Sequence, residues 1–254
     1  MIQLKNAKEL AVMRRACEIS ALALRRGGEA IEAGITTAEI DKIIFDFIKR
    51  QGAKPNFKGL YGFPGTACIS VNDEVIHGIP SHAKVIRPGD IVSIDTGAAF
   101  GGFNGDNACT FGCGKLDLEA QRLLDVTRES LHRGIAAAVF GARVGDISNA
   151  VQTYVEENGF SVVRDFVGHG VGRQLHESPE VPNFGRPGHG VRLQKGMTLA
   201  VEPMVNAGVW AVNVLPDGWT VKTRDGKLSA HYENTIAITD GDPEILTAID
   251  GEVL

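Results

Sequence analysis

The feature that most constrains the fold of this chain is an internal repeat with an offset of 107 residues. Two amphipathic segments, each ended by a glycine, align at this offset. Their apolar positions are Ile40, Ile43, Ile44, Phe47 and Ile48 in the first, and Ile147, Ala150, Val151, Tyr154 and Val155 in the second. The same offset aligns residues 89–95, GDIVSID, with residues 196–202, GMTLAVE. Any two amphipathic helices can be slid into register, but that explains only one pair of segments, so we expect a duplicated fold.

The pattern within each half predicts two helices followed by strands. Helices are expected at 6–33, 36–52 and 118–139, and in a fourth segment that ends at Gly159. Thr36 and Glu39 form a capping box at the start of the second helix. Strand-like runs occupy 67–71, 91–95 and 107–111. We therefore predict an α+β fold of one domain, with antiparallel sheets covered by helices and pseudo-twofold halves of about 1–115 and 116–254.

The composition is that of an ordinary globular protein and argues against several functions. The 254 residues are 43% hydrophobic and 22% charged, and the net charge of −5 favours neither a nucleic-acid partner nor an anionic membrane surface. No apolar run reaches the roughly 20 residues of a membrane helix, and the first ten residues do not resemble a secretory signal. The four cysteines form no CxxC pair, which suits reduced thiols in a cytoplasm.

Two aspartates flank a glycine-rich segment that can form a β-hairpin. Asp95 ends one strand-like run and Asp106 precedes another, with Gly101 and Gly102 near the midpoint. A turn just before this glycine pair sets the aspartates directly opposite each other, where two like charges are destabilising unless a proton or a cation binds. We expect a metal site; the alternative is that a β-bulge turns one aspartate away. The repeat also places Asp95 and Glu202 at equivalent strand ends, so a twofold axis can bring them to one site.

Further side chains complete a candidate ligand set. His169 lies in GHGVG, whose glycines argue against a helix and allow a ligand or backbone to approach closely. Glu202 follows an apolar run and Glu233 precedes one; taken singly, each is most simply a surface residue. With Asp95 and Asp106 they offer one imidazole and four carboxylates. This set suits a pair of divalent cations such as Mn, Fe, Co or Zn better than a structural zinc site, which favours cysteine.

Two more histidines are candidates for other roles. His176 follows His169 by seven residues, and because the segment is not helical we expect the two to act differently, one as a ligand and one toward the substrate. His77 lies in the segment VIHGIP, where a structural role and a catalytic role are equally open.

Six motifs resemble those of the type I methionine aminopeptidases of metallopeptidase family M24, and the resemblance extends over nearly the whole chain. They are VNDEVIHGIP, RPGDIVSIDTG, GDNACTF, GHGVGRQLHE, LAVEPMV and DGWTVKTRDGKLSAHYENT. The resemblance implies the pita-bread fold, which agrees with the duplication. It also implies two divalent metal ions, one held by Asp95 and the other by His169 and Glu202, with Asp106 and Glu233 bridging both.

The resemblance implies roles around the metals as well. The methionine side chain would enter a pocket lined by Phe63, Cys68, Leu175 and Trp219, although plain core packing stays open for each of these four. Positions that depart from the family pattern are Phe63, Leu175, Phe184, His231 and Asn234, which leaves the pocket preference open. On a strand, His231 would face the same side as Glu233 and could support the metal site.

The implied activity is hydrolysis of the amino-terminal methionine from nascent proteins when the second residue is small. A metal-activated hydroxide would attack the methionyl carbonyl and Glu202 would move a proton, while His176 stabilises the oxyanion and His77 positions the scissile nitrogen. The family further implies a cytoplasmic monomer that associates transiently with ribosomes and reads no nucleic-acid sequence. Because Ile2 is bulky, we expect Met1 to be retained.

Three other interpretations compete with this one. A prolidase-like X-Pro peptidase would use the same metal ligands on other substrates. A non-catalytic binding module typically loses such ligands, and all five are present here. A metal-stabilised structural protein would have no need of His77 and His176.

Overall fold

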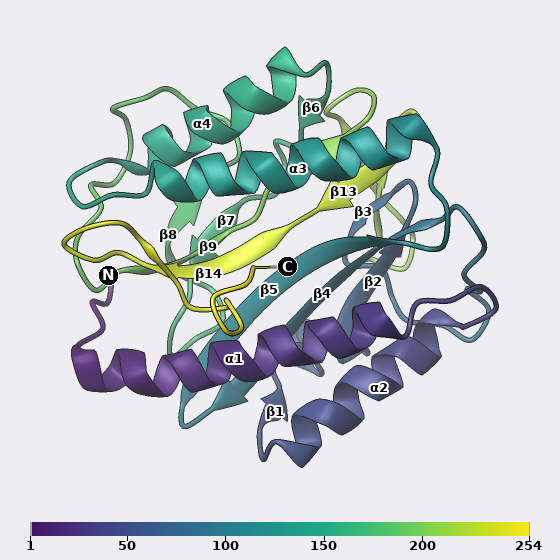
Figure 1. Cartoon of the computed structure of the whole chain (residues 1–254), viewed down its shortest axis with the longest axis horizontal. Coiled ribbons are helices and arrows are strands. Elements are labelled where there is room, and N and C mark those ends of the chain that lie inside the picture. The colour runs from purple at the N-terminus through teal and green to yellow at the C-terminus, as the bar shows by residue number, and fades with distance from the viewer. Residues whose placement is uncertain (1, 254) are drawn as a thin grey trace.

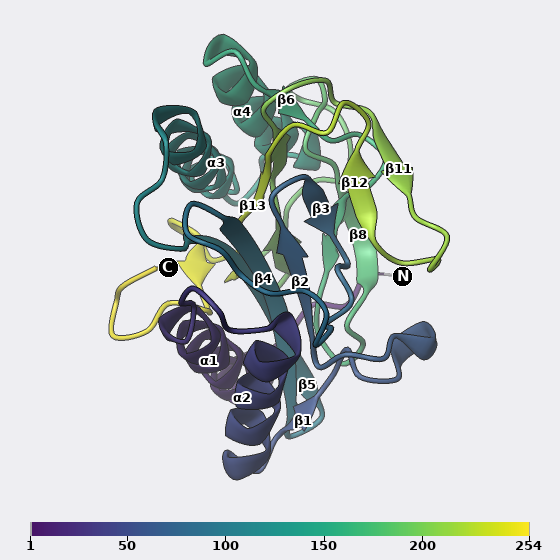
Figure 2. The same ribbon diagram turned by 90° about the vertical axis from the view of Figure 1, so that its right-hand side faces the viewer.

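The computed structural model describes residues 2–253, so Met1 and its expected retention lie outside the described residues. An antiparallel sheet of nine strands runs through the molecule in the order β1-β4-β5-β14-β9-β7-β8, with β2 paired to β4 and β15 paired to β14. Helix α1 packs on β4 and β5, and α3 packs on β9 and β14 (Figure 1). Figure 2 shows α1 and α3 on one side of the sheet and the ribbon of β11, β12 and β3 on the other.

The elements have the following bounds. The helices are α1 Ala7–Glu29, α2 Thr37–Arg50, α3 Leu118–Ala136 and α4 Val144–Glu157, with a 3-10 turn at Leu60–Gly62. Strands of the large sheet are β1 Lys54–Pro55, β2 Ala67–Val71, β4 Ile91–Phe100, β5 Phe103–Gly112, β7 Gly168–Gly170, β8 Glu177–Val181, β9 Thr198–Val201, β14 Glu233–Ala237 and β15 Glu244–Ile245. One small sheet contains β13 Ser229–His231, β10 Met204–Asn206 and β6 Ser161–Val162. The other contains β11 Val212–Val214, β12 Val221–Thr223 and β3 Glu74–Ile76.

The bounds of the elements repeat with the offset that the sequence indicates. Helix α4 begins and ends 107 residues after α2, and β9 begins 107 residues after β4. The expected capping box of Thr36 and Glu39 starts α2. Each helix buries one apolar face, formed by Ile40, Ile44 and Ile48 in α2 and by Ile147, Val151 and Val155 in α4. The predicted α+β class and the duplication are thus confirmed.

Two helices are shorter than predicted. Helix α1 ends at Glu29 rather than at residue 33, because the N–H groups of Ala30 and Ile31 bond to carbonyls only three residues back. Helix α3 ends at Ala136 rather than at residue 139, where Ala138 makes the same kind of bond to Ile135. Such bonds tighten the last turn and satisfy carbonyls that would otherwise lack a donor.

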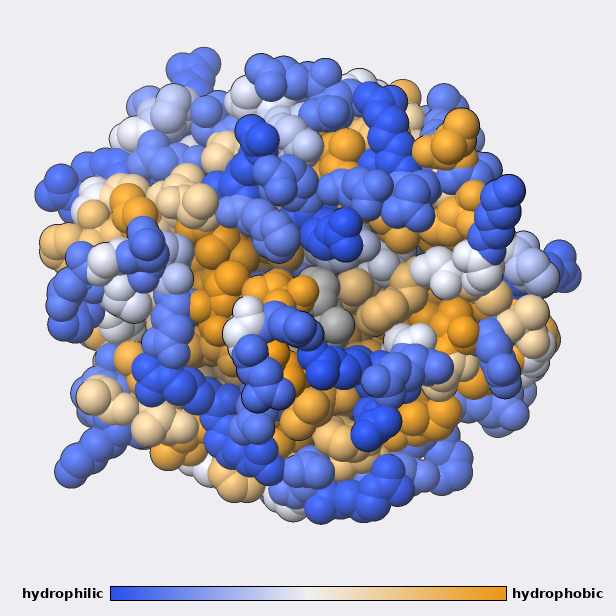
Figure 3. Space-filling view, viewed as in Figure 1, coloured by the Kyte–Doolittle hydropathy of each residue, from blue (hydrophilic) through white to orange (hydrophobic). Residues whose placement is uncertain are grey.

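The apolar core lies between the helices and the sheet, and the helices present polar side chains outward. Figure 3 shows many hydrophilic side chains over α1 and α3, with hydrophobic residues visible between the two helices and at other places on this face. Within residues 2–253, no helix has both the length and the apolar character that crossing a lipid bilayer requires.

Candidate metal centre

The hairpin of β4 and β5 places Asp95 and Asp106 on one face of the sheet, but not directly opposite each other as predicted. Asp95 pairs with Ala108, and Asp106 pairs with Gly97. The prediction was wrong by two residues because Gly101 and Gly102, with φ of 58° and 83°, both occupy the centre of the turn. Both aspartates lie inside their strands rather than at the ends. Residues displaced by two across a pair of strands remain diagonal neighbours, so the carboxylates still share a site.

The predicted ligands converge from five segments of the large sheet. Ala108, a small residue, lies between Asp95 on β4 and Glu233 on β14 in the strand register. The Nε2 atom of His169, on β7, lies 3.6 Å from Asp106 Oδ2 and 3.6 Å from Glu202 Oε1. One ligand atom from each of Asp106, His169 and Glu233 lies within 4.8 Å of the other two. The structure therefore gathers all five side chains into one cluster.

Four buried carboxyl groups in one cluster are unfavourable as anions. Burial raises the pKa of Asp95 to about 8. Burial, followed by the charges of neighbouring carboxylates, raises the pKa values of Asp106, Glu202 and Glu233 well above their ordinary range. Among the described residues, Asp95 Oδ1, Asp106 Oδ1 and Glu233 Oε1 are buried without a hydrogen-bond partner. Buried oxygens of this kind require a counter-charge, and divalent cations supply it.

The hydrogen bond of His169 leaves its other nitrogen free for a metal. Nδ1 lies 2.9 Å from the carbonyl oxygen of Gly170, which can only accept, so Nδ1 carries the proton. Nε2 is then unprotonated and faces Asp106 and Glu202. Burial lowers the pKa of His169 to about 4, which keeps the ring neutral as a ligand must be. The donor set thus fits divalent cations of the manganese, iron, cobalt or zinc type.

His231 reaches the cluster by a different route from the predicted one. We expected His231 and Glu233 on one strand, but the chain passes from β13 of a small sheet to β14 of the large sheet between them. His231 is nevertheless buried, and its Nε2 lies 3.8 Å from Glu202 Oε2. Burial lowers its pKa to about 3, so its ring is neutral.

A cavity of about 540 Å³ opens beside the carboxylates. Its lining includes the four predicted pocket residues, Phe63, Cys68, Leu175 and Trp219. Phe63 and Trp219 meet edge to face with their ring centres 5.2 Å apart. Cys68 pairs with Asp95 across β2 and β4, so the apolar pocket and the ligand cluster share a wall. Phe57, Leu60 and Tyr61 also line the cavity, although we did not predict them from the sequence. The apolar and aromatic residues of this glycine-rich loop could have indicated them.

The two other candidate histidines, His77 and His176, line the same cavity. His77 has a left-handed backbone, with φ of 57°, and its ring meets Phe166 and Trp219 edge to face. Burial lowers the pKa of His77 to about 4. The ring of His176 lies 4.5 Å from that of His169, centre to centre, while His176 itself is exposed. The two imidazoles thus approach the cluster from the cavity side.

Fold and site define a peptidase that uses metal, and comparison with known proteins agrees. The pattern of metallopeptidase family M24 matches residues 11–240, so the chain belongs to that family. It is 57% identical to a methionine aminopeptidase of Clostridium perfringens over 249 residues, and the alignment covers 98% of this chain and 100% of the relative. Methionine aminopeptidase 1 of Bacillus subtilis is 51% identical, with the same coverage. Within family M24, the chain belongs with the methionine aminopeptidases.

Solved structures support the fold assignment. A methionine aminopeptidase of Thermotoga maritima has a TM-score of 0.96 at 47% identity, covering 97% of this chain and 99% of that one. A prolidase of Pyrococcus furiosus has a TM-score of 0.79 at 23% identity and shares the fold, but this chain covers only 66% of its length. The architecture is the pita-bread fold implied by the sequence motifs.

Proposed function

We propose that this chain removes the amino-terminal methionine from newly made proteins whose second residue is small. The observation that carries the proposal is the shared wall between five metal-ligating side chains and a cavity lined by apolar and aromatic residues. An unbranched thioether side chain suits such a pocket. With the methionine side chain in this pocket, the first peptide bond would lie beside the carboxylates.

Two divalent cations fit this cluster better than one. Asp95 would hold one, His169 and Glu202 the other, and Asp106 and Glu233 both. Four carboxylates balance the charge of two such ions, and all four are buried, so a single cation would leave excess negative charge. When bound, the ions lower the pKa of water and polarise the substrate carbonyl. We propose manganese, iron, cobalt or zinc as the metal.

The chain's own residues would bind and orient the peptide. Glu202 would move a proton from the attacking water to the leaving amine. His176, at the mouth of the cavity, would donate to the developing oxyanion, and His77 would position the scissile nitrogen. Phe63, Cys68, Leu175 and Trp219 would enclose the methionine side chain and exclude water from it. The position of these side chains around one cavity supports the proposed roles.

We further propose that the chain acts as one catalytic domain, a monomer in the cytoplasm that associates transiently with ribosomes. Both halves supply ligands to the site, Asp95 and Asp106 from the first and His169, Glu202 and Glu233 from the second. A site divided in this way needs the two halves folded together. Nascent chains with a free amino terminus are the substrates that such an enzyme would meet.

Methionine release from two peptides, Met-Ala-Ser and Met-Leu-Ser, tests the proposal. We expect release from the first only, lost on chelation and restored by a divalent metal. A panel of X-Pro peptides run in parallel distinguishes a prolidase-like activity. Cleavage of that panel without methionine release, or no cleavage under any metal, would refute the proposed function.

A further inference from the structure

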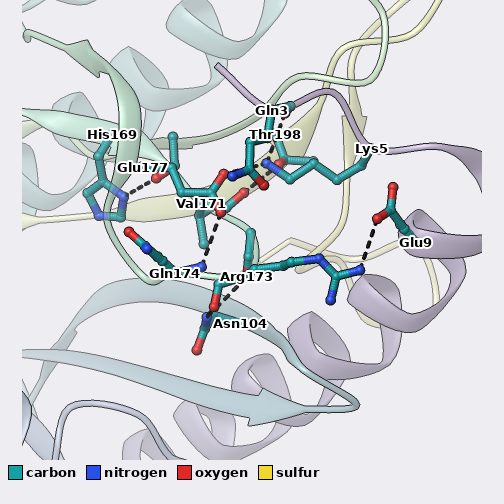
Figure 4. Close-up of polar contacts among 12 residues, drawn as sticks. Gln3, Lys5, Glu9, Asn104, His169, Val171, Arg173, Gln174, Glu177 and Thr198 are labelled. Carbon is teal, nitrogen blue, oxygen red and sulfur yellow. Dashed lines mark hydrogen bonds and ion pairs between the residues drawn. The ribbon is translucent and has the colours of Figure 1, made fainter. Parts of the chain in front are cut away.

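The amino-terminal segment of the chain lies against the loop that carries His176. Residues 2–6 precede α1 and run beside the β7–β8 loop, residues 171–176 (Figure 4). The backbone N–H of Lys5 donates to the carbonyl of Gly196 at 2.7 Å, which fixes the segment beside the start of β9. From this position the Lys5 side chain reaches Glu177, the residue that follows His176.

Lys5 and Glu177 form a buried ion pair. Lys5 Nζ lies 2.6 Å from Glu177 Oε2, and the two side chains are only 4% and 8% exposed. The second carboxylate oxygen, Oε1, accepts the backbone N–H of Gln174 at 3.1 Å, which closes the end of the loop on itself. Lys5 Nζ also donates to the carbonyl of Gln3 at 3.1 Å. Removing one partner of such a pair leaves an uncompensated buried charge.

Glycines in the GHGVG motif make room for this arrangement. A Cβ atom on Gly172 would lie 2.6 Å from Lys5 Nζ and 2.7 Å from Glu177 Oε1, so a larger residue here would have to displace the two charged groups. Gly170 instead admits the carbonyl of Ser178, which a Cβ would approach to 2.4 Å. The close approach expected at this motif is therefore made partly by the chain's own lysine.

Other contacts hold the start of the β7–β8 loop. Asn104 Nδ2 donates to the carbonyls of Gly172 and Arg173 at 3.0 and 3.1 Å, and the Thr198 hydroxyl donates to the carbonyl of Val171. The Lys5–Glu177 pair acts at the opposite end, next to His176. His176 is exposed, and its ring meets those of Tyr61 and His169 with ring centres 6.0 and 4.5 Å apart, so the position of its backbone decides whether the imidazole keeps these contacts.

We propose that Lys5 is a positioning residue, which fixes Glu177 and thereby holds the His176 imidazole toward the substrate carbonyl. The inference rests on the proposed function, since it acts through the role assigned to His176. The His176 ring lies 4.5 Å from the His169 ring, so a shift of the loop moves it relative to the ligand cluster. A misplacement of about 1 Å can lower a rate by about 100-fold.

The variant Lys5→Met tests the proposal with the metal-loaded enzyme and the Met-Ala-Ser peptide. We expect kcat to fall about tenfold or more, KM to stay within about twofold, and metal content to stay unchanged. In chelator-treated protein, amide hydrogen exchange of residues 171–177 should become faster. Arg173→Met is the matched control, because Arg173 joins the same loop to Glu9 by a 3.0 Å pair whose side chains are 55% and 28% exposed. This control should retain kcat within about twofold.

A double variant separates positioning from folding. Lys5→Met with Glu177→Gln leaves no unpaired buried charge, so its melting temperature should recover while kcat stays low. Recovery of kcat together with the melting temperature, or an unchanged kcat in Lys5→Met, would overturn the proposal. If Lys5→Met does not fold, the double variant carries the test alone. Absence of methionine release by the unaltered chain refutes the proposed function instead, and the exchange measurement still decides whether Lys5 holds the loop.

Discussion

Glu202 lies between two buried imidazoles. Its Oε1 atom is 3.6 Å from His169 Nε2, and its Oε2 atom is 3.8 Å from His231 Nε2. Burial lowers the pKa values of His169 and His231 to about 4 and 3, so both rings are neutral at neutral pH. A carboxylate flanked by neutral rings has no cation of the protein to balance its charge. This environment suits both roles proposed for Glu202, as a metal ligand and as a proton carrier.

Replacing Glu202 should therefore affect two properties at once. We expect Glu202→Ala to lower kcat by at least about 10³-fold and to weaken metal binding, since it removes a ligand and a proton carrier. Peptide turnover and metal content by atomic emission check this. Glu180→Ala is the control, because Glu180 is an exposed carboxylate at the rim of the same cavity. Near-normal turnover in Glu202→Ala would remove Glu202 from the mechanism.

His176 gives the contrasting result at the same scale. We expect His176→Ala to keep its metals while kcat falls by about 10²- to 10³-fold, because the oxyanion loses a donor and the ligand set stays complete. His82→Ala, which removes an exposed imidazole outside the cavity, should change neither. Loss of metal from His176→Ala would identify His176 as a metal ligand. His169 would then be the candidate for the residue that donates to the oxyanion.

At the scale of the elements, periodic patterns predicted the helices well and strand register poorly. The apolar spacing of α2 and its capping box place that helix correctly, since both signals are local. The offset of Asp95 and Asp106 depends on which glycines occupy the turn, and a shift of the turn by one residue displaces the pairing by two. The break between His231 and Glu233 depends on sheet packing around Tyr232, which no local pattern encodes.

The contact between α1 and β5 supports the hairpin from behind. A Cβ atom on Gly105, next to Asp106, would lie 2.5 Å from Cys17 Cα and 2.6 Å from Cys17 N. Both are backbone atoms of α1, so Gly105→Ala must push the helix from the sheet. We expect a loss of about 1–3 kcal/mol in the free energy of unfolding, measured by urea denaturation of chelator-treated protein.

Gly241→Ala is the matched control for this substitution. Gly241 has no positive φ, and the nearest atom to its added Cβ would be 4.0 Å away. Its stability should change by less than about 0.5 kcal/mol. Equal stability of the two variants would mean that α1 and β5 separate without cost, contrary to the close packing described.

The whole molecule is two similar halves that meet at a cluster of like charges. Residue types and motifs indicated the five proposed ligands, and the duplication relates two of them, Asp95 and Glu202, across the halves. The sequence could not show that Ala108 separates Asp95 from Glu233, or that Lys5 pairs with Glu177, since both depend on how distant segments pack. Cations bound to the deprotonated carboxyls would stabilise the junction of the halves, which would connect metal binding with the stability of the entire fold.

Stability without metal should therefore fall as pH rises toward 8. The pKa of Asp95 in the folded chain is about 8, against about 3.9 in an unfolded one, and the other three carboxyls are also raised. Between these values the folded state holds protons that the unfolded state releases, so the free energy of unfolding decreases as pH rises. The buried histidines have lowered pKa values and act in the opposite direction, but their contribution to this pH dependence fades as pH rises above about 6.5, the ordinary pKa of histidine.

The decisive window is thus about pH 7–8, where the carboxyls dominate the change in stability. Chelator-treated protein should lose up to about 1.4 kcal/mol per pH unit for each carboxyl that is still protonated, whereas metal-loaded protein should hold or gain stability because cations bind the deprotonated ligands. Urea denaturation at closely spaced pH values measures both slopes. Asp95→Asn cannot ionise at this position. In chelator-treated protein it should therefore make the dependence of the unfolding free energy on pH shallower, by the contribution of one proton. A flat profile in unaltered, chelator-treated protein would mean that the carboxylates are already ionised in the folded chain, and that cations are not needed to bring the two halves together.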